Sequence, residues 1–196
     1  FMITKIIKWF FNIFYNILKL IDKYLIKFNK PSLISIIQNI HHESSYKKIE
    51  VLNNIVNFYT PNQLTLWRVD TFYTKEPETL QWINSFENNK DFVFWDIGAN
   101  IGLYSIYAAI RHKNCEIISF EPSSSNLRIL SRNLSINDLD DRISIFSLPL
   151  TNNPNKFLLM KEGSFDEGGA LNTFGENFDF EGKDFKAETK YKLFGS

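Results

Sequence analysis

The sequence Asp-Phe-Val-Phe-Trp-Asp-Ile-Gly-Ala-Asn-Ile-Gly, residues 91–102, carries the strongest structural signal in this chain. Its run from Phe92 to Trp95 is unbroken, apolar and rich in aromatic residues, which predicts a strand buried on both faces of a parallel sheet. The run stops at Asp96, a turn with two glycines follows, and the apolar residues 103–110 then predict a helix packed on the sheet. The stretch therefore predicts a strand, a glycine-rich turn and a helix.

The turn of this unit has the pattern Asp-x-Gly-x-Asn-x-Gly, formed by Asp96, Gly98, Asn100 and Gly102. A ligand is expected at such a turn, because the amino terminus of the helix offers free N–H groups and a positive dipole end. Glycine is needed there because a side chain would block the turn or the ligand. The patterns Gly-x-Gly-x-x-Gly and Gly-x-x-x-x-Gly-Lys-Ser/Thr are both absent, which disfavours a dehydrogenase and a phosphate loop. An acid before the first glycine would repel a pyrophosphate but accept a cationic amino-acid group.

The second expected strand, residues 116–120, ends in Glu121-Pro122. An acid at this point can accept hydrogen bonds from both hydroxyls of an adenosine ribose. Dinucleotide folds use the same device, so Glu121 discriminates between ligands only together with Asp96 and Asn100.

These motifs resemble those of the FkbM family of S-adenosylmethionine-dependent methyltransferases. The resemblance rests on Phe-Trp-Asp-Ile-Gly-Ala-Asn-Ile-Gly-Leu-Tyr-Ser at 94–105, on Ser-Phe-Glu-Pro-Ser-Ser-Ser-Asn-Leu at 119–127 and on Asn133, and it runs roughly from Thr60 to the end of the chain. It implies a Rossmann-like class I methyltransferase sheet with S-adenosylmethionine as the methyl donor. The cofactor-binding residues expected on this basis are Asp96, Gly98, Ala99, Asn100, Gly102, Glu121 and Pro122.

The resemblance also implies the reaction, most often methylation of a hydroxyl on a sugar or secondary metabolite, so the expected partner is a small-molecule or glycan acceptor. The loop from Gly98 to Gly102 would shape the pocket for the methionine part of the donor. Asp96 would contact the ammonium group directly or through water, and Glu121 would bind the ribose hydroxyls. The sequence identifies no catalytic base. We discount a metal site at His41-His42-Glu43, because adjacent histidines on a helix point in different directions.

We expect the methyltransferase sheet to be incomplete. About three central strands can be counted between Phe92 and Phe146, fewer than a full doubly wound sheet has. In the family that the chain resembles, a later Asp-x-Glu-Gly segment and much of the acceptor site follow, and no such segment occurs before Ser196. The Phe before Met2 is a further irregularity, and both ends suggest a partial reading frame. The alternative to an enzyme is therefore a non-catalytic, truncated Rossmann-like module that binds a nucleotide or tethers to a membrane.

Composition bounds these expectations. The chain has 196 residues with 22 basic and 22 acidic side chains, so it offers no long-range attraction for nucleic acid. We expect three segments: an amphipathic helix at 1–30, a helical and short-strand leader at 31–90 and the methyltransferase domain at 91–196. The single Cys115 cannot form an internal disulfide, which fits a reducing, cytoplasmic location, and it is expected to be a packed residue at the start of the second strand.

Residues 3–30 predict one helix with a narrow basic face. Its polar residues recur in steps of three or four and so share one stripe; they are Lys5, Lys8, Asn12, Asn16, Lys19, Lys23, Lys27 and Lys30. The longest uncharged run, Trp9 to Leu18, is shorter than the ~20 residues that span a bilayer. A secretory signal fits poorly because lysines recur throughout.

Two interpretations of this helix stay open. In one it makes peripheral membrane contact, with the lysines toward anionic head groups and the aromatic rings inserted. In the other its apolar face covers the catalytic domain or a second subunit.

The leader segment gives weaker signals. Pro31 breaks the first helix and Ser32 is the expected cap of a second one that ends near Gln38. Residues 50–59 are too mixed to assign, although residues 49, 52, 55 and 56 are apolar and spaced like a helix face. Residues 64–73 alternate in part and predict one or two short strands.

A third helix is expected to start at Thr74 as its cap, with Pro77 in the first turn. Glu76 and Glu78 would lie near the positive end of its dipole, which accounts for them physically. Similar Glu-Pro-Glu-Thr segments precede the nucleotide motif in relatives that the chain resembles, so a place on the rim of the cofactor pocket stays open for them.

The remaining elements follow from caps and turn residues. The serines at 123–125 cap a helix over 126–136, residues 142–146 form the third strand, and 149–154 form a loop. We expect strands at 156–161 and 189–193, with a hairpin around 170–174. His112 lies near the end of the first sheet-packed helix, where a cation is favoured by the dipole, and this is its whole expected role.

Overall fold

The computed structural model describes residues 2–87, 91–152 and 154–196. Phe1, residues 88–90 and Asn153 lie outside the described residues, and with them one residue of the predicted loop at 149–154. The chain divides into two compact units, residues 1–45 and 46–196. Each unit is described by itself.

The first unit contains two helices, α1 (Met2–Lys27) and α2 (Leu33–Ser44). The helix predicted over 3–30 is confirmed, but it ends at Lys27. The cap predicted at Ser32 is also confirmed, because Ser32 accepts a hydrogen bond from the backbone N–H of Ser35 at 3.2 Å. The predicted end near Gln38 is wrong: no Gly or Pro interrupts residues 33–44, and α2 continues through His41 and His42. In the described part of the chain, no helix combines the length and the apolar character that crossing a bilayer requires.

The second unit opens with an antiparallel hairpin of β1 (Tyr46–Val51) and β2 (Asn54–Tyr59). Leu52 and Asn53 form its turn with φ angles of 49° and 65°. The helix-like spacing noted in residues 49–56 is therefore misleading. Val56 and Phe58, two residues apart on β2, are both buried, which is the spacing of a strand face.

Three helices follow: α3 (Gln63–Asp70), α4 (Phe72–Lys75) and α5 (Pro77–Asn84). The strands predicted at 64–73 are wrong, because Asn62 and Thr65 form a capping box that starts α3. The cap predicted at Thr74 is also wrong, since Thr74 lies inside α4 and Glu76 occupies the N-cap position of α5 without a side-chain cap bond. Pro77 does stand in the first turn of α5, as expected.

The centre of the second unit is a parallel sheet of β3 (Val93–Ile97), β4 (Glu116–Phe120) and β5 (Ile143–Phe146), in the order β3-β4-β5. Helices α6 (Leu103–Arg111) and α7 (Ser124–Ser135) connect the strands. This is the order of one half of a doubly wound Rossmann sheet, in which ligands bind at the carboxyl ends of the strands. The predicted α/β class, Rossmann-like sheet and preceding amphipathic helix are confirmed.

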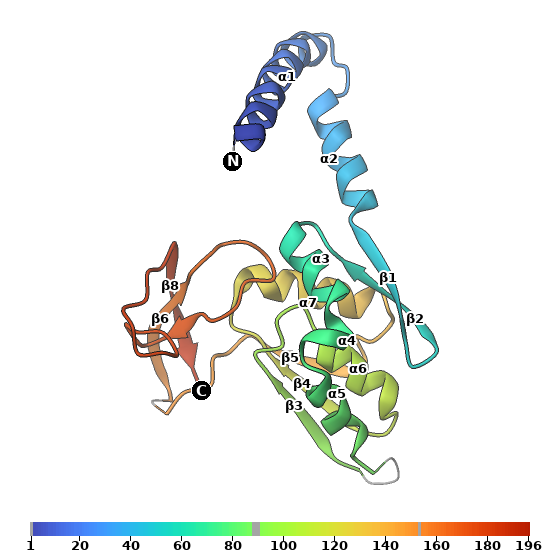
Figure 1. Cartoon of the computed structure of the whole chain (residues 1–196), viewed down its shortest axis with the longest axis vertical. Coiled ribbons are helices and arrows are strands. Elements are labelled where there is room, and N and C mark those ends of the chain that lie inside the picture. The colour runs from blue at the N-terminus through green and yellow to red at the C-terminus, as the bar shows by residue number, and fades with distance from the viewer. Residues whose placement is uncertain (1, 88–90, 153) are drawn as a thin grey trace. The chain divides into compact units, whose positions relative to one another are not determined.

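Only one face of this sheet is covered within the described residues. Phe94, Ile117 and Ile143 share a buried face, whereas Val93 and Trp95 are 50% and 55% exposed. Figure 1 shows α5 and α6 together on one side of the sheet. The prediction that the first strand is buried on both faces is therefore wrong, because an apolar run does not reveal whether helices cover one face or two.

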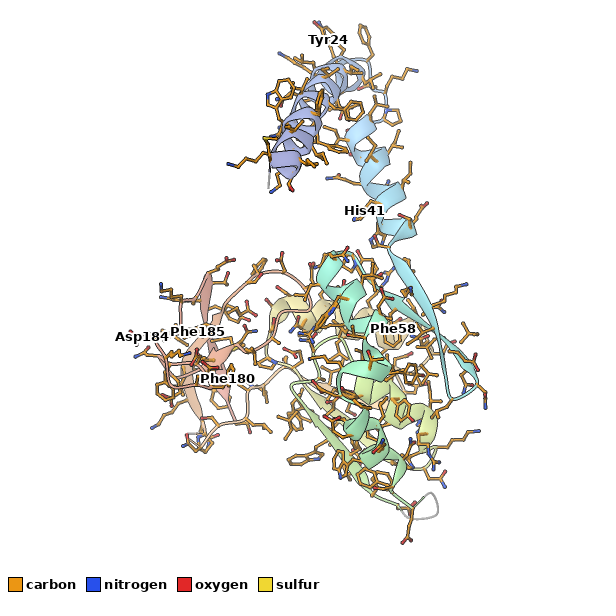
Figure 2. All side chains as sticks on the ribbon, viewed as in Figure 1. Tyr24, His41, Phe58, Phe180, Asp184 and Phe185 are labelled. Carbon is orange, nitrogen blue, oxygen red and sulfur yellow. The ribbon has the colours of Figure 1, made fainter. Side chains whose placement is uncertain are left out.

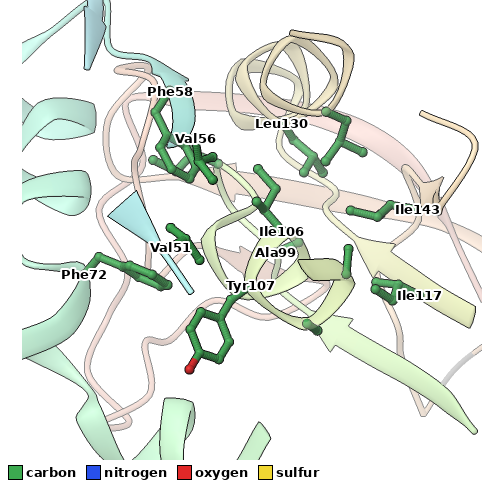
Figure 3. Packing of buried hydrophobic residues seen from close by; sticks show 14 of the residues in the cluster. Val51, Val56, Phe58, Phe72, Ala99, Ile106, Tyr107, Ile117, Leu130 and Ile143 are labelled. Carbon is green, nitrogen blue, oxygen red and sulfur yellow. The ribbon is translucent and has the colours of Figure 1, made fainter. Parts of the chain in front are cut away.

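The core forms where the hairpin, helices and sheet converge (Figure 3). Each of these elements contributes fully or nearly fully buried apolar side chains. They include Val51, Val56, Phe58, Phe72, Ile106, Tyr107, Ile117, Leu130 and Ile143.

A second, antiparallel sheet contains β6 (Lys156–Glu162), β7 (Thr173–Phe174) and β8 (Thr189–Gly195), in the order β7-β6-β8. The strands predicted at 156–161 and 189–193 are confirmed. The hairpin predicted at 170–174 forms only in part, since β7 pairs with Met160 and Lys161 while residues 170–172 remain in a loop.

Candidate functional site

The glycine-rich turn between β3 and α6 adopts the left-handed backbone that its residue types allow. Gly98, Asn100 and Gly102 have φ angles of 79°, 53° and 88°, and glycine and asparagine adopt this conformation most readily. The turn continues the sheet ladder, because the N–H groups of Gly98 and Ala99 donate to the carbonyl of Phe120 at 2.8 and 3.0 Å. The loop is therefore fixed against the end of β4.

The first and last glycines of the loop have different surroundings. A Cβ at Gly98 would meet nothing within 4 Å, whereas a Cβ at Gly102 would lie 2.5 Å from Cδ1 of Leu130. Gly102 is thus needed for close packing of α6 on α7, while Gly98 faces open space. The expected blocking effect of a side chain on a ligand applies to Gly98.

Glu121 lies at the end of β4 with its carboxylate against the glycine loop. One oxygen accepts from the N–H of Asn100 at 2.6 Å, and the other accepts from the N–H of Ser123 at 2.8 Å. Burial raises the pKa of the Glu121 carboxyl, and these backbone hydrogen bonds oppose that rise. The carboxylate links the loop to the start of α7.

Asp96 lies near the end of β3, and its side chain contacts α6 rather than the cavities that border the loop. Its carboxylate accepts a hydrogen bond from the hydroxyl of Ser105 at 2.5 Å, and that hydroxyl also contacts Ser119 Oγ at 2.7 Å. Burial raises the pKa of the Asp96 carboxyl. Asp96 is 8% exposed and lines neither of the two cavities that border the loop.

The first cavity, of about 170 Å³, lies between the glycine loop and the α3–α5 segment. Arg68, Lys75 and Glu76 bring both charge signs to it. Glu76 is held in place by the hydroxyl of Tyr104, which donates to it at 2.9 Å, and by Lys75 at 3.0 Å. Burial lowers the pKa of Arg68, and the nearby Glu76 carboxylate opposes this effect. Of the two acids left open as rim residues, Glu76 lines the cavity and Glu78 does not.

The second cavity, of about 200 Å³, borders the other side of the loop. Gly98 and Asn100 line both cavities, and Glu121 and Pro122 line the second one together with Asn126. The carboxyl ends of β3 and β4 thus bring together most of the residues that the sequence predicted. Ala99 lines the first cavity, whereas Asp96 and Gly102 lie behind the loop.

Residues 168–170, which we call the strap, lie between the two cavities. The carbonyl of Gly169 accepts from the side-chain amides of Asn100 at 2.7 Å and Asn126 at 2.9 Å. The carbonyl of Gly168 accepts from Arg68 Nε at 2.5 Å. Ala170 lines both cavities. The strap therefore divides the space above the glycine loop.

The sequence did not point to several residues of this site. Arg68 was not singled out, and Tyr104 and Asn126 stood within the two quoted motifs without a role in the site. A spacing signal existed for Asn126, because it stands five residues after Glu121 and its amide lies 3.5 Å from that carboxylate. No local signal connects Arg68 to a loop 100 residues later.

His112 and Cys115, which the sequence also singled out, are buried and contact backbone carbonyl oxygens. His112 is buried and its Nε2 lies 2.8 Å from the carbonyl oxygen of Ile83, so its expected role as a dipole-stabilised cation at a helix end does not describe it fully. Cys115 is buried at the start of β4, as expected, and its thiol donates to the carbonyl of His112. The part of the chain that the structure describes holds no group of three or more His, Cys, Asp or Glu side chains placed to bind a metal ion.

Asn133, one of the residues that carries the resemblance, connects two parts of the core. Its side-chain amide donates to the carbonyl of Ile101 at 2.8 Å, and its oxygen accepts from the N–H of Tyr59 at 2.8 Å. Asn133 therefore ties the glycine loop to the β1–β2 hairpin.

No known family profile matches the chain. It is 39% identical over 69 residues to the methyltransferase SdnD of Sordaria araneosa, a match that covers 31% of this chain and 27% of that protein. The chain therefore spans about a quarter of the length of this curated relative.

Two solved structures overlap with it in part. One is a putative S-adenosyl-L-methionine-dependent methyltransferase from Methanococcus maripaludis, with 22% identity, a TM-score of 0.38, and coverage of 48% of this chain and 44% of that one. The other is a SAM-dependent methyltransferase from Agrobacterium tumefaciens, with 11% identity, a TM-score of 0.42, and coverage of 53% and 32%.

Proposed function

We propose that this chain is an S-adenosylmethionine-dependent methyltransferase of the FkbM kind. The observation that carries the proposal is the meeting of the Glu121 carboxylate with the Gly98–Asn100 turn at the carboxyl end of a parallel sheet, beside two cavities. The match to a relative named as a methyltransferase supports the same reaction class.

The adenosine part of the donor fits the second cavity in this proposal. Glu121 accepts the ribose hydroxyls, because each carboxylate oxygen that already binds a backbone N–H keeps a further lone pair. Gly98 and Pro122 form the wall against which the nucleoside packs. The polar Asn126 amide completes this wall.

The methionine part fits the first cavity. An α-amino carboxylate carries both charges, and the cavity offers Glu76 to its ammonium group and Arg68 to its carboxylate. Asp96 acts on the ammonium group through water, because its carboxylate is engaged with Ser105 behind the loop.

Methyl transfer from a sulfonium is an in-line displacement: the acceptor oxygen forms a bond to the methyl carbon as the carbon–sulfur bond breaks. The protein's main task is to align donor and acceptor and to exclude water. We propose a hydroxyl of a sugar or secondary metabolite as the acceptor. Its proton passes to water, and the sulfur leaves as the neutral thioether of the demethylated donor.

Calorimetric titration tests the donor site. We expect S-adenosylmethionine and its demethylated product to bind in the micromolar range and NAD not to bind. Glu121→Gln should weaken binding ~10- to 100-fold, because it removes hydrogen bonds to a charged acceptor. Glu162→Gln is the matched control, since Glu162 is equally buried but lines neither cavity.

Three outcomes would contradict the proposal. NAD binding in preference to the sulfonium would assign the site to another class of cofactor. Unchanged affinity in Glu121→Gln would place the donor elsewhere. Donor binding without transfer to any hydroxyl acceptor would instead favour the non-catalytic nucleotide-binding module.

A further inference from the structure

The first 45 residues carry a large apolar surface that the proposed methyltransferase reaction does not use. Seven apolar side chains of α1 recur in steps of three and four and are between 41% and 70% exposed; they are Ile3, Ile6, Phe10, Ile13, Ile17, Leu20 and Tyr24. We call this set the outer stripe of α1. Figure 2 shows the side chain of Tyr24 directed away from the helix axis.

The exposed apolar surface extends well beyond the outer stripe. Positions beside it carry Ile7, Trp9, Phe14 and Ile21, which are 48%, 58%, 54% and 41% exposed. A two-helix coiled coil buries a narrow seam and places charged residues beside it. The apolar surface of α1 is too broad for such a seam, and it matches a helix that lies in a lipid interface.

The charged side chains of α1 also favour a lipid surface as its partner. The helix carries Lys5, Lys8, Lys19, Lys23 and Lys27, and its acid Asp22 is buried. The Asp22 carboxylate accepts hydrogen bonds from the hydroxyl of Ser32 at 2.5 Å and from the N–H groups of Leu33 and Ile34 at 2.6 and 3.2 Å. We call these contacts the Asp22 clasp. Because Asp22 is buried in the clasp, the exposed charged side chains of α1 are all lysines.

The clasp also sets the geometry of the helical pair. It joins the last turns of α1 to the first turn of α2 and thereby caps α2. Between the helices lies a groove of about 420 Å³, lined mainly by apolar residues such as Phe14, Leu18 and Ile37. The groove continues the apolar surface from α1 onto α2.

We infer that the α1–α2 hairpin binds the surface of an anionic lipid bilayer. The outer stripe enters the boundary between head groups and acyl chains, and the lysines face the anionic head groups. A second copy of this chain is a poorer partner, because two helices with five lysines each would repel one another. The inference is independent of the proposed methyltransferase activity.

Vesicle flotation of the full chain tests this inference. We expect binding to vesicles of phosphatidylcholine with phosphatidylserine, weaker binding to phosphatidylcholine alone, and loss of binding as salt increases. The double variant Phe10→Ser/Ile17→Ser should bind at least ~tenfold more weakly, because it removes two large apolar side chains from the outer stripe. Its matched control is Ile55→Ser/Phe180→Ser, which removes the same two side-chain types from positions 66% and 75% exposed in the second unit.

A variant with fewer lysines measures the electrostatic contribution to vesicle binding. Lys8→Gln/Lys19→Gln leaves the outer stripe intact and should weaken binding to anionic vesicles ~fivefold for each lysine, with little change on phosphatidylcholine. Circular dichroism and urea unfolding verify that each variant keeps its fold.

Two results would overturn the inference. The first is a folded chain that binds neither type of vesicle. The second is a chain that elutes as a dimer and becomes a monomer in Phe10→Ser/Ile17→Ser, because the stripe would then be occupied by a second copy.

Discussion

The two units of this chain are stabilised in opposite ways. In residues 46–196 the buried side chains are mostly apolar, and they come from the hairpin, the helices and the parallel sheet. Among the described residues of the first 45, the buried ones are Asp22 and Ser45, which are both polar. Both units contain helices with strong apolar faces. An apolar helix face therefore forms a core only where a second apolar surface packs closely against it.

The largest expected effect concerns the core side of the glycine loop. Gly102→Ala combines a left-handed φ with a Cβ 2.5 Å from buried Leu130, and should lower the free energy of unfolding by ~2–5 kcal/mol. Gly98→Ala has the same backbone strain but open space, and should cost ~1–2 kcal/mol. Phe10→Ala in α1 should cost less than ~0.5 kcal/mol. Urea unfolding measures all three.

This ranking can fail in an informative way. Equal destabilisation by Gly102→Ala and Gly98→Ala would show that Leu130 moves aside at little cost. Gly98→Ala should also block the proposed donor site, since Gly98 lines both cavities. A Gly98→Ala protein that is stable and binds the donor normally would contradict the position of the site.

The next effect concerns the polar contacts inside the core. Asn133→Ala leaves the N–H of Tyr59 and the carbonyl of Ile101 without their partner, and should cost ~2–4 kcal/mol. Asn137→Ala removes a similar pair of contacts to Asn57 at a half-buried site, and should cost about half as much. Denaturant unfolding monitored by fluorescence compares the two, and a larger loss for Asn137→Ala would reverse the expected dependence on burial.

The two units should also differ in how their stability depends on pH, because each buries a carboxylate with a shifted pKa. Burial raises the pKa of Asp96 above its ordinary 3.8, so the folded protein holds that proton more tightly. The contribution of the protonated Asp96 carboxyl to the free energy of unfolding is fully present below pH 3.8. It is lost as the pH rises through the raised pKa. Asp96→Asn should therefore gain stability relative to the parent as the pH rises in this window, by up to ~1.4 kcal/mol per pH unit. Unfolding of both proteins across this pH range checks the sign.

Asp22 should respond in the opposite direction. Hydrogen bonds from Ser32, Leu33 and Ile34 lower the pKa of Asp22. The stabilisation from the clasp is therefore present at pH values above the ordinary pKa of Asp, and it is lost as the pH falls through the lowered pKa. Asp22→Asn should speed tryptic cleavage after Lys23 and Lys27 without changing the unfolding of the second unit. Glu43→Gln, an exposed acid on α2, serves as the control. Equal cleavage rates in the two variants would show that the clasp does not hold the hairpin together.

The elements that were predicted correctly depend on local chemistry. The turn at Gly98–Gly102 needs residues that accept a positive φ, and the cap at Ser32 needs a side-chain oxygen next to free N–H groups. Such constraints are visible within a few residues. The acid at Glu121 was also found this way, because it directly follows a strand.

The features that were missed depend on contacts far apart in the chain. The β1–β2 hairpin was hidden by helix-like spacing, and only packing of Val56 and Phe58 in the core selects the strand pattern. The exposed face of β3 depends on which helices reach the sheet. The strap binds through backbone carbonyls of Gly168 and Gly169 to side chains 43 to 100 residues away, and a backbone carbonyl leaves no signature in a sequence.

The strap has a kinetic consequence. Each cavity beside it is smaller than the ~300 Å³ at which small-molecule sites usually begin. A ligand that fills both cavities must wait until the contacts of the strap to Arg68, Asn100 and Asn126 have broken. The observed rate constant of binding should then reach a plateau at high ligand concentration. The plateau equals the rate constant at which the strap detaches. In stopped-flow mixing, Asn126→Ala should raise this plateau, because it removes one of the hydrogen bonds that hold the strap.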